Sequence, residues 1–204
     1  MNQQPSPQNG KQGRSYVRGV VLRHTPRQMC GGLQQMSFSP GLNILVGPNG
    51  CGKSTILRVL RDTGWRELHE CEIVKAGKGN VEWFGYDAEQ DNPRSNSSRD
   101  AFPFLSAAGS HGQVQRRVFK YISERLQPGM LVIMDEPEAA LDMDGVEVLF
   151  ATIQGRPDLQ WVIASHHILI WQLADANVIE MVPGHRDKTI MQHQRIIASS
   201  GPGA

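Results

Sequence analysis

Short apolar runs alternate with stretches of helical spacing along most of this chain. Such runs stand at 42–46, 130–134 and 160–164, and they are typical of parallel strands that are covered on both faces. Apolar residues recur with helical spacing at 54–62 and at 112–126, where the second stretch ends before a Gln-Pro-Gly stop signal. The alternation predicts an α/β fold with a mostly parallel, doubly wound sheet, whose ligands bind at the carboxyl ends of the strands.

The other elements are predicted from shorter patterns. Segments 16–22 and 34–39 precede the first buried strand and are predicted to form a small antiparallel sheet. Strands at 71–75 and 80–86 are predicted to form a hairpin, and 91–103 is expected to be a polar loop. The remaining predictions are helices at 144–154 and 168–174, a strand at 177–182, and either a strand or a short helix at 189–197.

Length and composition suit a single α/β domain, which we place at residues 15–185. Residues 1–14 are rich in Gln, Pro, Gly and Asn and are expected to be a disordered tail. Residues 186–204 are expected to form a C-terminal extension that is partly disordered. The formal net charge is +1, from 21 Lys and Arg against 20 Asp and Glu, so the global charge favours neither nucleic acid nor a membrane as partner.

The cysteines and the apolar windows indicate the compartment. Cys30, Cys51 and Cys71 form no metal-ligand pattern, and an odd number of cysteines is a poor disulfide framework, so we expect a reducing cytosol. The N-terminus lacks the apolar core of a signal peptide. Charged and polar residues interrupt the most apolar long window, 161–182. We therefore expect a cytoplasmic protein with no transmembrane segment of its own.

The segment 47–55 matches the phosphate-binding loop G-x-x-x-x-G-K-[ST] and lies between a predicted buried strand and a predicted helix. Glycines allow the backbone to wrap around phosphate oxygens, and the N–H groups at the helix start form a positive pole. Lys53 adds a charge toward the β- and γ-phosphates, and the Ser54 hydroxyl is placed to ligate Mg²⁺. A Gly-rich turn that matches by chance is the alternative. The residues predicted to bind nucleotide here are Asn49, Gly50, Cys51, Gly52, Lys53, Ser54 and Thr55.

An acidic pair, Asp135 and Glu136, ends the apolar run at 130–134. A carboxylate at a strand end that faces the phosphate loop can hold Mg²⁺ directly or through water, which is the role predicted for Asp135. The carboxylate of Glu136 can polarise the attacking water. Charges that merely cap a helix are the alternative interpretation.

Two further stretches carry candidate chemistry. His166 follows the strand at 160–164 and can donate a hydrogen bond to a γ-phosphate, although a satisfied structural histidine is the alternative and His167 is a weaker competitor. Ser110 begins a helix, where its hydroxyl and the free N–H groups form a second anion site. An ordinary helix N-cap is the alternative for Ser110.

In the order of these motifs, the chain resembles the ABC-type ATPases over residues 15–183. Within them it resembles a standalone, soluble branch related to SMC, DNA-repair and defence-associated ATPases. The correspondences are Gly47–Thr55 with the Walker A loop, Ser110–Gln113 with the LSGGQ signature, Leu131–Glu136 with Walker B, Ala140–Asp142 with the D-loop, and Ser165–His166 with the switch histidine. Gln90 corresponds to the Q-loop glutamine, which would contact nucleotide and Mg²⁺.

The resemblance implies an ATP-dependent dimer, either of two copies or with a related head, with ATP and Mg²⁺ as cofactors. Each phosphate loop would be closed by Ser110 and Gly112 from the other chain. Glu136 would activate water and His166 would sense the γ-phosphate. Asp142 would couple the two sites.

The chain also departs from the family. Its signature lacks the leucine and the second glycine that are typical of transporter subunits. The short interval between Ser54 and Ser110 leaves no room for the long coiled coil of SMC-type proteins and implies a reduced helical subdomain.

Three functions remain open at this stage. The first is an ATPase that switches a partner protein acting on nucleic acid, because Arg116, Arg117, Lys120 and Arg125 share one predicted helix. A solvated helix face explains these charges equally well. The second is the ATP-binding subunit of a membrane ABC transporter. The third is a nucleotide-binding scaffold with negligible turnover.

Overall fold

The computed structural model describes residues 15–23, 33–68, 70–78, 80–87, 94–95, 110–139, 141–173 and 175–199. Its larger sheet has the strand order β6-β5-β7-β8-β3-β9. Strands β5, β7, β8, β3 and β9 are parallel to one another, and β6 pairs antiparallel with β5 at one edge. The bounds are β3 (Leu42–Val46), β5 (Trp83–Asp87), β6 (Arg94–Ser95), β7 (Leu131–Asp135), β8 (Gln160–Ala164) and β9 (Asn177–Glu180).

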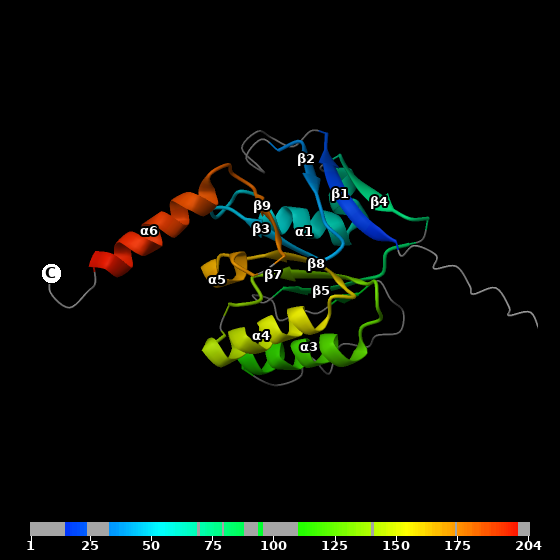
Figure 1. Cartoon of the computed structure of the whole chain (residues 1–204). Coiled ribbons are helices and arrows are strands. Elements are labelled where there is room, and N and C mark those ends of the chain that lie inside the picture. Colours follow the sequence, from blue (N-terminus) through cyan, green and yellow to red (C-terminus); the bar gives the residue numbers. More distant parts are fainter. Residues whose placement is uncertain are drawn as a thin grey trace, which may run out of the picture.

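Helices cover both faces of this sheet, as the predicted doubly wound arrangement requires. Figure 1 shows α1 above the sheet and the pair α3 and α4 below it. The bounds are α1 (Lys53–Arg61), α2 (Thr63–Leu68), α3 (His111–Arg125), α4 (Met143–Gly155), α5 (Ile168–Trp171) and α6 (His185–Ser199). The parallel α/β prediction is therefore confirmed.

Alternating side chains of the central strands supply two separate cores. Ile44 and Val46 of β3 belong to the cluster that includes residues of α3, α4 and α5, whereas Leu45 belongs to the cluster around α1. All three side chains are fully buried. Successive side chains of a strand point to opposite faces, so an uninterrupted apolar run can fill both cores.

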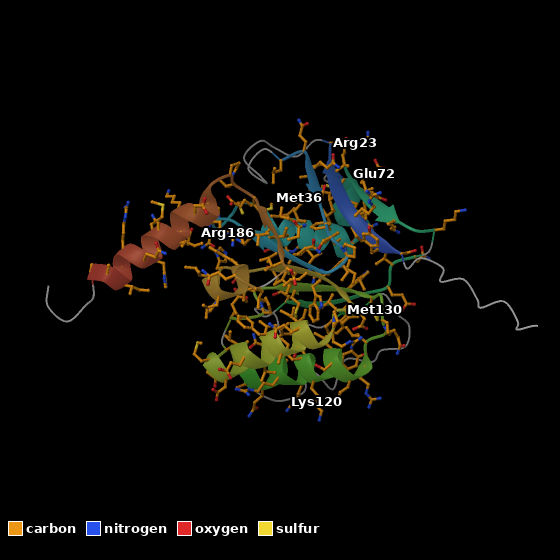
Figure 2. All side chains as sticks on the ribbon, in the orientation of Figure 1. Arg23, Met36, Glu72, Lys120, Met130 and Arg186 are labelled. Carbon is orange, nitrogen blue, oxygen red and sulfur yellow. The ribbon has the colours of Figure 1, made fainter. Side chains whose placement is uncertain are left out.

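A second, three-stranded sheet lies against the α1 side and has the order β2-β1-β4. It consists of β1 (Tyr16–Leu22), β2 (Gln35–Ser37) and β4 (Cys71–Ala76). Both pairings are antiparallel, so the small antiparallel sheet predicted from the first two strands is confirmed. Arg23 and Glu72 form an ion pair of 2.6 Å at one end of β1 and β4, and Figure 2 labels both.

The predicted hairpin of 71–75 with 80–86 is wrong. β4 pairs with β1 in the small sheet, while β5 enters the large sheet parallel to β7. The burial patterns give the physical reason: Phe84 to Asp87 are all buried, as in a central strand, whereas β4 has buried residues on neither face. The connection between them is therefore a crossover between sheets.

Other differences concern short elements. Within the predicted loop 91–103, Arg94–Ser95 forms the edge strand β6, and the rest of that loop lies outside the described residues. α5 spans four residues instead of the predicted 168–174, and α2 was not predicted. The expected tail at 1–14 and the segment 96–109, which would hold much of the reduced helical subdomain, also lie outside the described residues.

Residues 189–197, for which a strand and a short helix were both predicted as possible, are helical and belong to α6. Figure 1 shows α6 extending away from the domain on the side where α5 lies. None of its residues is buried, and its exposed side chains include Met191, Ile196 and Ile197. At its base, Arg186 donates to the carbonyl oxygen of Trp171 (3.3 Å). Among the described residues, no helix is long and apolar enough to cross a membrane.

Candidate functional site

The phosphate loop connects the end of β3 to the start of α1. Gly50 and Gly52 have φ angles of 75° and 101°, a left-handed region that glycine adopts without steric cost. A Cβ on Gly47 would lie 2.6 Å from Cys51 Sγ and 3.0 Å from Met181 Cβ, so only glycine fits at that position. The loop needs glycine at these three positions for two different physical reasons, conformation and space.

Lys53 folds back over this loop. Its Nζ donates to the carbonyl oxygens of Gly47 (3.0 Å) and Pro48 (3.3 Å), and the side chain is buried. The N–H of Cys51 donates to Pro48 (3.3 Å), and the Cys51 side chain is buried in the core around α1. The ammonium group is therefore held against the loop, where phosphate oxygens would replace the carbonyl oxygens as its acceptors.

Ser54 and Asp135 meet across the gap between α1 and β7. The Ser54 hydroxyl lies close enough to the Asp135 carboxylate to lower its pKa, and Asp135 Oδ1 is buried with no hydrogen-bond partner among the described residues. The pKa of Asp135 is raised to about 6: burial is the main cause, the neighbouring Asp87 and Glu136 carboxylates also raise it, and Ser54 and Arg61 act in the opposite direction. The negative charge of the Asp135 carboxylate is therefore not fully offset by nearby positive charge.

A divalent cation would supply that charge. Ser54 and Asp135 provide a hydroxyl oxygen and a carboxylate oxygen, which are the hard ligands that Mg²⁺ prefers. In the part of the chain that the structure describes, no group of three or more His, Cys, Asp or Glu side chains could hold a metal ion. These residues thus fit Mg²⁺ that takes its remaining ligands from phosphate oxygens and water.

Glu136 turns its carboxylate toward His166. Its φ of 46° is in the left-handed region, which costs a non-glycine residue roughly 1 kcal/mol. Glu136 Oε1 lies 3.4 Å from His166 Nε2, a longer distance than a good hydrogen bond. Burial lowers the pKa of His166, and the charge of Lys53 lowers it further, so the imidazole is neutral at pH 7.

Ser110 and Asp142 lie at the N-termini of α3 and α4. Ser110 caps α3 in a capping box with Gln113, so in a single chain its hydroxyl does what the N-cap interpretation expects. Asp142 caps α4 by accepting from the N–H of Gly145 (2.8 Å) and also accepts from Arg116 (3.0 Å). The contact between Arg116 and Asp142 joins α3 to the start of α4.

Of the other predicted residues, Gly112 lies in the first turn of α3, and Asn49 and Thr55 lie in the loop and in α1. Gln90, the Q-loop prediction, lies outside the described residues.

The sequence analysis missed two carboxylates. Asp87 ends β5 directly beside Asp135, and it was missed because the predicted hairpin placed that strand elsewhere. A carboxylate after an apolar strand, Trp83–Tyr86, was the available signal. Glu138, which the sequence analysis did not single out, contacts Ser165 and His166.

Comparisons with known proteins concern part of the sequence and the overall fold. A family model described as an AAA domain matches residues 27–81, which include the phosphate loop. A protein from Pyrococcus furiosus described as an ABC transporter ATP-binding protein is 13% identical over 83% of this chain and 98% of its own, with a TM-score of 0.47. A bacterial Atm1-family ABC exporter with ATP bound is 14% identical over 94% of this chain, which spans only 43% of the exporter, with a TM-score of 0.48. No curated protein is similar in sequence to this chain. With the loop 47–55 between a parallel strand and a helix, the chain has a P-loop NTPase fold.

The pKa of Asp135 leads to a stability prediction. Because that pKa is raised from 3.8 to about 6, the charged carboxylate costs folding free energy above pH 6, and the cost fades toward pH 4 as the folded state takes up a proton. Without nucleotide and Mg²⁺, we expect Asp135→Asn to raise the free energy of unfolding by about 1–3 kcal/mol at pH 7.5, and by progressively less toward pH 5. Urea unfolding at several pH values measures this.

The control is Asp142→Asn, which makes the same charge change on an exposed side chain and keeps a good N-cap residue. It should change the free energy of unfolding by less than about 0.5 kcal/mol at every pH. The raised pKa of Asp135 would be contradicted if the Asp135→Asn protein were less stable than wild type at pH 7.5, or equally stabilised at all pH values.

Proposed function

We propose that this chain binds ATP with Mg²⁺ and hydrolyses it. The observation that carries the proposal is the meeting of Ser54 with Asp135 beside the Lys53 loop, with Glu136 after β7 facing His166 after β8. Glycine-rich loop, lysine, hydroxyl and carboxylate together form the set that phosphoryl transfer to water requires.

The roles follow from the environment of each side chain. Lys53 would bind the β- and γ-phosphates, and Ser54 and Asp135 would hold Mg²⁺, which neutralises charge on the phosphate oxygens. Glu136, about one-third exposed, can accept a proton from the attacking water. Neutral His166 can donate a ring N–H to the γ-phosphate without bringing a second positive charge next to Lys53.

We further propose that two heads close around two nucleotides. The starts of α3 and α4 carry Ser110, Gly112 and Asp142, and Arg116 joins the two helix starts through Asp142. A helix start with serine and glycine suits an anion, such as a phosphate held at the phosphate loop of another chain. A second copy, or a related head, would supply it to that loop.

We also propose that this ATP-dependent dimer switches a partner protein that acts on nucleic acid. Arg116, Arg117, Lys120 and Arg125 are all exposed on α3, and Figure 2 shows Lys120 on the side of α3 that faces away from the sheet. Exposure of these side chains permits contact with phosphates or with an acidic protein surface.

Glu136→Gln tests the hydrolysis. The amide cannot accept the proton of water but keeps the shape of the side chain, so we expect the ATPase rate to fall by about 10²- to 10⁴-fold while ATP binding persists. The variant should become dimeric in ATP and Mg²⁺ and remain monomeric in ADP, as measured by light scattering. Lys53→Ala, as the control, should lose both binding and turnover. Turnover by Glu136→Gln at the wild-type rate would contradict the role of Glu136.

A mixing experiment tests whether the site is shared between chains. Lys53→Ala damages one phosphate loop, and Ser110→Arg damages only the helix start that is offered to another chain. Each variant alone should be inactive. An equal mixture should regain up to roughly a quarter of the wild-type rate, because half of its dimers are mixed and each mixed dimer has one complete site. A mixture as inactive as its components contradicts sharing of the site.

A further inference from the structure

A buried carboxylate connects the turn that carries Glu136 with the loop that carries His166. Glu138 Oε1 accepts one hydrogen bond from the Ser165 hydroxyl (2.7 Å) and another from the backbone N–H of His166 (2.9 Å). The contact joins residues that are 27 and 28 positions apart in the chain. It is therefore a long-range connection between the ends of β7 and β8.

Ser165 is held from every side. Its side chain is fully buried, its N–H donates to Leu45 of β3 (3.3 Å), and its carbonyl oxygen accepts from the indole N–H of Trp171 (3.0 Å). Its hydroxyl oxygen also accepts from the N–H of His167 (3.0 Å). Glu138 thus reaches a residue that is already fixed to β3 and α5, and the hydrogen bond to the N–H of His166 extends that fixation by one residue.

The turn on the other side is equally constrained. The N–H of Glu136 donates to Ala164 (2.9 Å), the N–H of Ala139 donates to Glu136 (2.9 Å), and the N–H of Leu141 donates to Glu138 (3.1 Å). These bonds fix the backbone of Glu136 in its left-handed conformation. Glu138, two residues later, then points to the same loop as Glu136 does.

Burial raises the pKa of Glu138, and the hydrogen bonds from Ser165 and His166 lower it. Its Oε2 is buried and has no hydrogen-bond partner among the described residues. A buried carboxyl group that uses only one oxygen costs free energy, which a purely structural position could avoid with an apolar residue.

We propose that Glu138 is a positioning residue for ATP hydrolysis: by holding the backbone of His166, it sets the distance between the Glu136 carboxylate and the His166 ring. This inference rests on the proposed ATPase function. The ring of His166 and the carboxylate of Glu136 lie 3.4 Å apart, and in the proposed reaction Glu136 has to meet the attacking water while His166 meets the γ-phosphate. A shift of about 1 Å in such a pair is sufficient to cost up to 10²-fold in rate.

Two substitutions of Glu138 distinguish the effect of its hydrogen bonds from the effect of its negative charge. Glu138→Ala removes the acceptor of both bonds, and we expect kcat to fall about 10- to 100-fold with KM for ATP changed less than about threefold. Glu138→Gln keeps a carbonyl oxygen at the position of Oε1, so its kcat should stay within about threefold of wild type. A drop in kcat of more than tenfold for a folded Glu138→Gln protein would overturn the positioning role.

A double-mutant cycle shows whether Glu138 acts through His166. If it does, Glu138→Ala should lower kcat by less than about threefold in a protein that already carries His166→Ala. Additive losses, a loss confined to KM, or an unchanged kcat in Glu138→Ala would each overturn the inference. If Glu138→Ala does not fold, Ser165→Ala decides: the N–H of His166 keeps its acceptor, so kcat should stay within about threefold, and a tenfold loss would overturn it.

Failure of this inference is distinguishable from failure of the proposed function. A wild-type protein that does not hydrolyse ATP would overturn both. A wild-type protein that hydrolyses ATP and a Glu138→Ala protein that does so equally well would overturn only the role of Glu138.

Discussion

The site depends on the proximity of the Ser54 hydroxyl to the Asp135 carboxylate. In this arrangement the first turn of α1 lies next to the end of β7, and the phosphate loop lies beside the acidic strand end. Because α1 and β7 are far apart in sequence, only the parallel order β7-β8-β3 brings these groups to one edge. The chemistry of the site is therefore a consequence of strand order.

That edge is electrostatically unbalanced. Asp87, Asp135 and Glu136 face it with their carboxylates, and Lys53 and Arg61 are the cations that act on Asp135 or His166. Burial makes each charge costly, which is why the pKa of Asp135 is high and that of His166 is low. Both shifts suit an edge that receives a polyanion with its divalent cation, since the two together restore the balance.

Local patterns were enough to predict the parallel α/β fold. The apolar runs predicted β3, β7 and β8, because strands covered on both faces consist almost entirely of apolar residues. The Gly-rich turn after β4 led to the wrong hairpin prediction, because a turn does not show whether the chain folds back or crosses to another sheet. Because of that error, Asp87 was not predicted to lie beside Asp135. Glu138 was missed because its partners, Ser165 and His166, are distant in sequence and are brought to it only by the pairing of β7 with β8.

The most direct measurement of the central claim is a crystal structure of the chain with Mg²⁺ and a non-hydrolysable ATP analogue. The account predicts a magnesium ion bound to the Ser54 hydroxyl at about 2.1 Å, with the Asp135 carboxylate as a direct ligand or one water away. The Lys53 ammonium should contact the β- and γ-phosphates. An analogue bound elsewhere, or a metal ion with neither Ser54 nor Asp135 in its coordination shell, would contradict the account.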